Sequence, residues 1–159
     1  MKTRFNLFDE LKINFLPKWQ DLPDLDLYLD QILYYVNKVS QTSVDRDPKG
    51  ITSSMVNNYV KQGYLDKPLK KKYQRHHLAR LIAIAFLKNV FSLPDIDEAL
   101  SLLRKEYSSE ELYNLFVSSM NDHAHVPELI DDACLAIKSY YKVRLSTLAL
   151  GGNHSESNL

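Results

Sequence analysis

Three polar side chains, Ser53, Asn57 and Lys61, recur at a spacing of four residues, which would place them in one row along a helix. Ser54 and Asn58 lie beside that row. An asparagine amide can form two hydrogen bonds with the edge of an adenine, and a serine hydroxyl can reach a base edge or a phosphate. Such a face fits the major groove of duplex DNA, which is about 12 Å wide. By itself a polar helix face is more often a solvent-exposed surface, so the residues that follow it carry the argument.

A cluster of cations comes directly after this helix. Pro68 interrupts residues 64–73 and excludes a long helix there, so this segment suits a small hairpin, or wing. Long cationic side chains on a wing can contact the phosphates beside the groove, and each such contact releases a counterion. Together the helix and the wing predict a DNA-binding surface. Its candidate residues are Thr52, Ser53, Ser54, Asn57, Asn58, Lys61, Lys67, Lys70, Lys71, Lys72, Tyr73 and Arg75.

The charged residues are unevenly distributed along the chain, although the net charge is zero. Residues 44–90 hold ten Lys and Arg side chains against three acids, whereas residues 91–159 hold five against eleven acids. A basic segment beside an acidic one is the asymmetry expected when a single face meets a polyanion. A solvated basic loop is the alternative interpretation of the charge pattern alone.

Local signals define both ends of the candidate recognition helix. Thr52 is a good N-cap, because its hydroxyl can accept a hydrogen bond from an unpaired amide of the first turn. Ile51 and Val56 have the spacing of a hydrophobic staple around that cap. Tyr59 continues the apolar stripe that Val56 begins. Gly63 is expected in the left-handed conformation that ends a helix.

Further helices must support this one. Apolar spacing predicts a long helix that begins at Asp24 or Asp26 and ends near residues 39–42. Another helix is expected over about residues 74–90. Ser92 and Ser108 are typical N-caps of helices that would extend to about residues 105 and 120. A last helix is expected from residues 126–127 to about residue 148. Because the chain has only four glycines, a β-rich fold is disfavoured and the expected class is all-α.

The predicted organisation has four parts. Residues 1–20 form an N-terminal arm, and residues 21–106 form a winged helix-turn-helix. Residues 107–149 form a C-terminal helical extension that serves dimerisation or effector binding, and residues 150–159 form a disordered tail. The ten tyrosines could line a pocket for an aromatic effector, although amphipathic helix packing explains them equally well.

From Thr52 to Leu100 the chain resembles the MerR-type module of bacterial regulators. The residues that carry this resemblance are segments 59–65, 71–73, 81–84, 87–88 and 91–96, together with Pro68. With segments 27–31 and 55–61 added, the chain resembles more closely a bacterial domain-of-unknown-function family related to MerR, over about residues 20–125. The resemblance implies a winged helix-turn-helix that works as a homodimer on a two-fold operator. Asn57 stands where MerR proteins often carry arginine, and Lys71 replaces the arginine of the wing.

Cysteine content and hydropathy limit the other classes of function. Cys134 is the only cysteine, so an internal disulfide and a thiolate zinc site are excluded. The first residues lack the apolar core of a signal peptide, and no stretch approaches the ~20 apolar residues that span a bilayer. We therefore expect a cytoplasmic protein with no membrane partner, no cofactor and no metal.

The sequence predicts a sequence-specific DNA-binding protein, a transcriptional regulator or an accessory protein of that kind, with no catalysis. The expected partners are double-stranded DNA, a second copy of the chain and an unidentified small-molecule effector. The main alternative keeps the MerR-like fold but binds another protein, as an adaptor or anti-regulator. The neutral total charge, Asn57 and the acidic C-terminal half favour that alternative. An enzyme acting on a small molecule would rest only on the histidines and tyrosines.

Overall fold

The computed structural model describes residues 7–11, 15–122 and 125–157. Within these residues the chain forms seven α-helices and one 3-10 helix, and no β-strand, which confirms the predicted all-α class. The elements are α1 (Leu7–Glu10), η1 (Trp19–Asp21), α2 (Leu29–Ser40), α3 (Ser53–Lys61), α4 (Arg75–Leu87), α5 (Leu93–Leu103), α6 (Ser109–Met120) and α7 (Glu128–Ser157).

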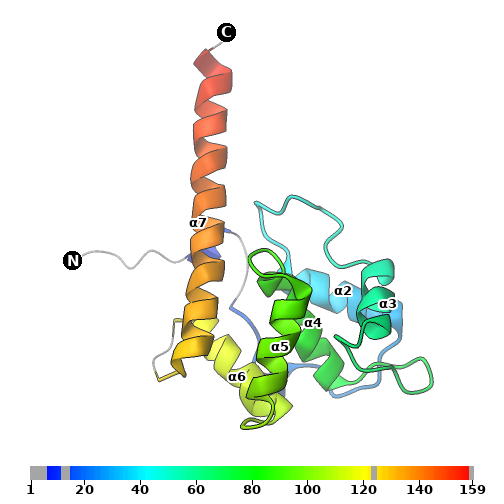
Figure 1. Cartoon of the computed structure of the whole chain (residues 1–159). Helices are drawn as coiled ribbons and strands as arrows, with labels where there is room; N and C mark the ends of the chain where they lie inside the picture. The colour runs from blue at the N-terminus through cyan, green and yellow to red at the C-terminus, as the bar shows by residue number, and fades with distance from the viewer. Residues whose placement is uncertain (1–6, 12–14, 123–124, 158–159) are drawn as a thin grey trace.

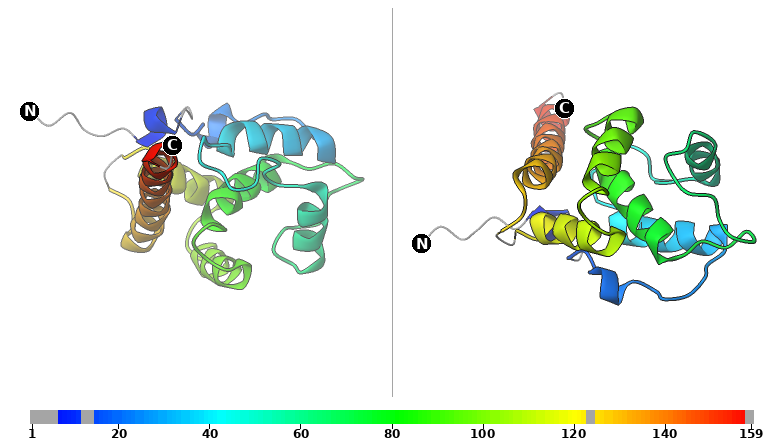
Figure 2. Two further views of the ribbon diagram at one scale, coloured as in Figure 1. Left: turned by 90° about the horizontal axis from the view of Figure 1, so that it is seen from above. Right: turned by 60° about the horizontal axis from the view of Figure 1, so that its bottom comes forward.

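Helix α4 is the centre of the fold. Ten of its 13 residues are buried, which is possible only for a helix that is covered on nearly every side. Its neighbours are α2, α5, α6 and α7 (Figures 1 and 2). Helix α3 packs against α2 and lies at one end of the molecule, whereas α7 lies at the other end. One hydrophobic core runs from α2 through α4 to α6 and α7, so residues 107–149 share their core with the preceding helices.

The segment before α2 docks on α6. The side chain of Asn121 accepts a hydrogen bond from the amide of Leu16 and donates one to its carbonyl oxygen, both at 3.3 Å. The Tyr113 hydroxyl donates to the carbonyl of Pro17 at 2.8 Å. Leu7, Phe8 and Leu11 are buried in the core. The rest of the predicted arm, residues 1–6 and 12–14, lies outside the described residues.

Helix α2 begins later than the sequence predicted. Its N-cap is Tyr28, whose amide donates to the Gln31 side chain at 2.9 Å, and neither Asp24 nor Asp26 caps it. The reason is tertiary. Leu27 pairs with Tyr73 in an antiparallel bridge with N–O distances of 2.7 and 2.8 Å, so its backbone is extended and cannot join the helix.

The N-terminal caps of α5 and α6 are confirmed. The Ser92 hydroxyl accepts from the Asp95 amide at 3.3 Å, and the Ser108 hydroxyl accepts from the Glu111 amide at 3.1 Å. The Glu111 carboxylate in turn accepts from the Ser108 amide, which completes a capping box. These caps fix α5 and α6 at the positions that the sequence predicted.

Helix α7 extends past the body of the molecule (Figure 1). The prediction that it ends near Leu148, with a disordered tail from residue 150, is wrong for residues 150–157, since the helix continues to Ser157. Its first half packs on α6 and α4. This packing stabilises the first helical turns, whose formation is the unfavourable step in making a helix. Each further residue then adds one backbone hydrogen bond, and no proline follows Pro127 to stop it. Residues 158–159 lie outside the described residues.

Candidate nucleic-acid interface

Helix α3 has the local structure that its sequence predicted. The Thr52 hydroxyl accepts a hydrogen bond from the Met55 amide at 3.3 Å, so Thr52 is the N-cap. Val56 and Tyr59 are buried, with exposures of 0% and 5%, and they fix which side of the helix faces the core. Gly63 has a φ of 81°, the left-handed conformation expected just after the end of the helix.

The opposite face of α3 is open to solvent. All five residues of the predicted polar row and its flank are exposed: Ser53, Ser54, Asn57, Asn58 and Lys61. Because the apolar face is buried against the body, this polar face is the side that a partner can reach. Hydroxyl, amide and ammonium groups on one exposed helix face can donate to and accept from base edges and phosphates.

Helix α3 is held to α2 by a residue that the sequence analysis missed. The side-chain amide of Asn37 accepts a hydrogen bond from the Ile51 amide at 2.8 Å and donates to the Ile51 carbonyl at 2.9 Å. Gly50, with a φ of 63°, passes so close to Asn37 that an added Cβ would overlap with the amide. No local pattern marks Asn37, since its partner lies 14 residues away in the chain.

The segment after α3 forms a hairpin-like loop rather than regular strands. The backbones of Leu69 and Lys72 exchange two hydrogen bonds at 2.9 and 3.0 Å around a two-residue turn. Lys70 and Lys71 occupy that turn with φ values of 50° and 64°. Two central residues at positive φ define a type I′ turn, which normally contains Asn and Gly. The segment that was predicted as a wing therefore forms a short turn with two lysines at its tip.

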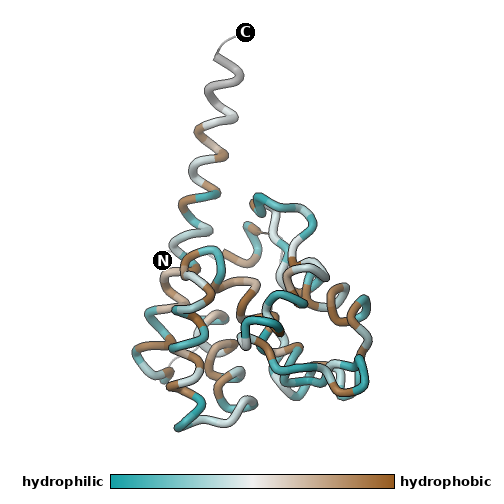
Figure 3. The backbone as a smooth tube through the Cα atoms, turned by 45° about the vertical axis from the view of Figure 1, so that its right-hand side comes forward, coloured by the Kyte–Doolittle hydropathy of each residue, from teal (hydrophilic) through white to brown (hydrophobic). Residues whose placement is uncertain are grey.

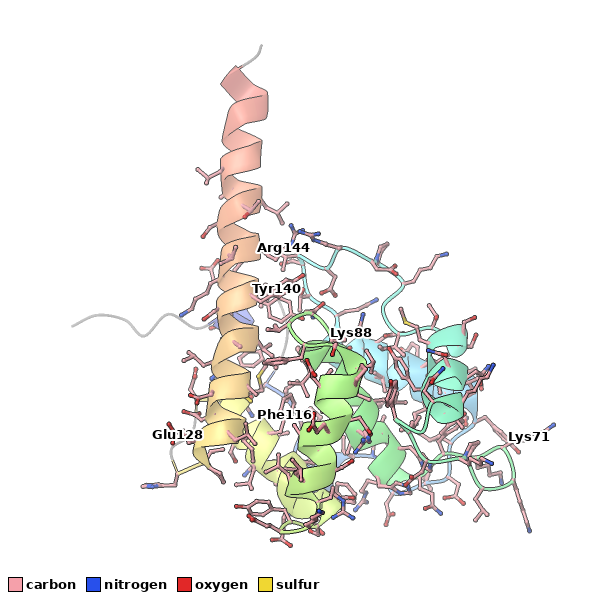
Figure 4. All side chains as sticks on the ribbon, in the orientation of Figure 1. Lys71, Lys88, Phe116, Glu128, Tyr140 and Arg144 are labelled. Carbon is pink, nitrogen blue, oxygen red and sulfur yellow. The ribbon has the colours of Figure 1, made fainter. Side chains whose placement is uncertain are left out.

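The lysines of this loop are accessible. Lys67, Lys70 and Lys71 are exposed, and Figure 4 shows Lys71 at the outer end of the loop. Figure 3 shows mainly hydrophilic residues along the same stretch. Lys72 is half-buried, and its ammonium lies 5.4 Å from the ring centroid of Tyr28. Three lysines thus project from the loop that follows α3, and a fourth rests on an aromatic ring.

Two predicted site residues are engaged inside the protein. Tyr73 is only 4% exposed, because its backbone pairs with Leu27 and its ring packs edge-on against His77 at 5.3 Å. Arg75 forms an ion pair with Asp24 at 3.4 Å and lies 5.8 Å from the ring centroid of Trp19. The structure therefore removes Tyr73 from the accessible surface and gives Arg75 a role in joining α4 to the segment before α2.

A buried histidine supports the wing. Nδ1 of His77 accepts from the Gln74 amide at 2.9 Å, and Nε2 lies 3.3 Å from the Lys67 carbonyl, so the neutral Nε2–H tautomer satisfies both contacts. Burial lowers the pKa of His77, and the neighbouring His76 lowers it further. In the described part of the chain, no three His, Cys, Asp or Glu side chains gather as a metal site would require.

No helix among the described residues is both long and apolar enough to cross a membrane. No curated protein and no solved structure matches the chain. One family does match, over residues 17–116, which runs from the end of the N-terminal segment into α6 and includes α3 and the wing. This range covers more than half of the 159 residues. The chain therefore belongs to the family described as "Domain of unknown function (DUF1836)".

Proposed function

We propose that this protein is a sequence-specific DNA-binding transcriptional regulator without catalytic activity, in which residues 21–106 act as a MerR-like winged helix-turn-helix. One observation carries the proposal. The polar face of α3 is exposed along its whole length, and three exposed lysines stand on the loop that follows it. A helix that enters a DNA groove requires an accessible polar face, and it requires cations beside it that contact the phosphates.

In this proposal α3 lies in the major groove. Asn57 and Asn58 contact base edges, where an asparagine amide matches the donor and acceptor pattern of adenine. Thr52 caps the helix and leaves other amides of the first turn free to meet a phosphate. Lys67, Lys70 and Lys71 neutralise phosphates beside the groove, a contribution that does not depend on base sequence.

The proposed regulator is a homodimer that associates through α7. This helix lies at the opposite end of the molecule from α3 (Figures 1 and 2), so pairing through α7 leaves both copies of α3 accessible. Its outer part carries exposed apolar side chains that a soluble monomer would leave in water: Val143, Leu148 and Leu150. A two-fold dimer on adjacent major grooves requires recognition helices about 34 Å apart.

Selection from a pool of random duplexes tests the proposal. The full chain is mixed with the pool, bound duplexes are recovered and sequenced, and enrichment of one motif is expected. Asn57→Ala should still bind DNA but should lose the preference for adenine at one position, since a good bidentate pair discriminates by about 1–3 kcal/mol. Lys38→Ala, an exposed change on α2, is the control and should select the parent motif. Recovery of no motif by the parent protein contradicts sequence-specific binding.

A second candidate function is a protein-interaction adaptor or anti-regulator on the same fold. The exposed apolar residues of α7 favour it, because Leu135 and Val143 are 59% and 64% exposed and could bind a different protein as readily as a second copy. The adaptor predicts no affinity for DNA at low salt, whereas the regulator predicts salt-sensitive binding. Binding to a labelled duplex, measured at low and at high salt, therefore separates the two functions.

A further inference from the structure

A cavity of about 560 Å³ lies between the helices on the α7 side of the molecule. Its lining comes from α4, α5, α6 and the first turns of α7, together with the segment that leads from α3 into the wing. In Figure 4, Phe116 of α6 lies in the space between α5 and α7. Cavities that hold small molecules in proteins usually measure about 300–1,000 Å³.

Small side chains create this space. Ala79 and Ala83 of α4, Ala99 of α5 and Ala133 of α7 all line it, where larger side chains would fill the space. Helix α5 has one buried residue, Ile96, and its main packing partner is α4. The result is an apolar space whose walls are separate helices.

The interior of the cavity is apolar. The side chains that line it and could contact a ligand most extensively are Leu87, Phe91, Leu100, Leu112, Phe116 and Ile130. Apolar ligands gain about 25 cal/mol for each Å² of apolar surface that they remove from water. A lining of this kind favours a ligand with hydrocarbon or aromatic surface over a sugar or a nucleotide.

The two arginines that line the cavity already have partners. Arg80 forms an ion pair with Asp97 at 2.9 Å, and its Nε donates to the Tyr64 carbonyl at 2.7 Å. Arg104 donates to the Tyr107 carbonyl at 2.6 Å. In the described residues, the buried side-chain nitrogens without a partner belong to Arg75 and Arg144, and neither residue lines the cavity. A charged ligand that enters the apolar part of the cavity would therefore lose its hydration without gaining a buried, unpaired partner.

We infer that this cavity is a binding site for an uncharged, largely apolar small molecule. The inference does not depend on DNA binding, since it rests on the volume and the apolar lining of the cavity. Its position gives it a connection to the candidate interface. Tyr64 and Asp66, which line the cavity, belong to the segment between α3 and the wing, and Arg80 holds the Tyr64 carbonyl.

Titration with N-phenyl-1-naphthylamine, an uncharged apolar fluorophore, tests the inference in the absence of DNA. We expect saturable binding to the full chain at one site per copy. Ala133→Phe fills the cavity and should weaken binding by about tenfold or more, equivalent to about 1.4 kcal/mol. Ala136→Phe is the matched control, because Ala136 is also half-buried on α7 but does not line the cavity. Its affinity should stay within about twofold of the parent.

Three further arms make the result decisive. Ala99→Phe blocks the cavity from the thinly packed α5 and should weaken binding in the same way, so the test survives if Ala133→Phe does not fold. The anionic fluorophore 8-anilinonaphthalene-1-sulfonate should bind more weakly than the uncharged one. Equal binding by parent and Ala133→Phe, or tighter binding of the sulfonate, overturns the inference. Conversion of a dimer to a monomer by Ala133→Phe, with fluorophore binding unchanged, assigns the cavity to a second copy and also overturns it.

Discussion

Nε2 of His77 lies 3.3 Å from the carbonyl oxygen of Lys67, so a buried histidine on α4 holds the loop that carries the exposed lysines. The other ring nitrogen, Nδ1, accepts a hydrogen bond from the Gln74 amide. If Nδ1 were protonated, its proton would face this amide N–H and would have no acceptor. The position of the wing relative to α4 therefore depends on a neutral imidazole.

This dependence predicts a loss of stability in mild acid. Since burial lowers the pKa of His77 in the folded protein, the unfolded chain binds a proton more readily below about pH 6.5. The contribution of His77 is complete above that pH and is lost as the pH falls. Urea unfolding between about pH 7.5 and 5.5 should show a decrease of at most about 1.4 kcal/mol per pH unit from this residue. An unchanged pH dependence in His77→Leu would show that the histidine is not responsible.

Asn37 should contribute more to stability than its half-buried position suggests. Asn37→Ala leaves the amide and carbonyl of Ile51 without their partners, and the expected cost is about 1–3 kcal/mol. Gln41→Ala, at the C-cap of the same helix, removes one exposed hydrogen bond to the Pro48 carbonyl and should cost less than about 0.5 kcal/mol. Denaturant titration of the two variants measures the difference. Equal costs would mean that Asn37 does not anchor α3.

Substitutions in the turn at Lys70 and Lys71 should change the free energy of unfolding and the affinity for DNA in opposite directions. Replacement of both lysines by Asn and Gly relieves two positive-φ residues and should raise the free energy of unfolding by about 1 kcal/mol or more. The same change removes two phosphate contacts and should weaken DNA binding. Lys70→Gln with Lys71→Gln is the matched variant, with the same charge loss and no relief of strain. If the Asn-Gly protein binds DNA as tightly as the parent, the turn lysines are not phosphate ligands.

Charges placed on the outer part of α7 should disrupt the proposed dimer. Val143 and Leu150 are 64% and 63% exposed, so their replacement by Glu does not disturb the core but places carboxylates in the interface. Sedimentation velocity should then show a monomer. Leu25→Glu with Leu102→Glu, two exposed leucines away from α7, should remain dimeric. A parent protein that is monomeric at high concentration would refute the dimer itself.

The parts that could be predicted from the sequence depend on neighbouring residues. The cap at Thr52, the stop at Gly63 and the exposure of the row that contains Asn57 follow from spacing within a few residues. These signals are local, so they can be identified in the sequence without knowledge of the fold. The caps of α5 and α6 could be predicted for the same reason.

The rest depends on contacts between distant segments. The pairing of Leu27 with Tyr73 shortened α2 and buried a tyrosine that the sequence had placed at the interface. Asp24 engaged Arg75 across 51 positions, and no periodic pattern reports such a partner. The helical residues after Leu148 were mistaken for a disordered tail because glycine and polar composition outweighed the continuity of an anchored helix.

The salt dependence of DNA binding tests the central proposal most directly. Fluorescence anisotropy of a labelled duplex gives Kd over a range of salt concentrations, and the slope of log Kd against log salt counts the phosphates that are neutralised. Changing Lys67, Lys70 and Lys71 to Gln should flatten the slope by up to about three units. Changing Lys18, Lys38 and Lys105, which are exposed elsewhere, alters the net charge equally and should flatten it by less than about one unit. Equal slopes for the two triple variants, or no binding at low salt, would contradict the account.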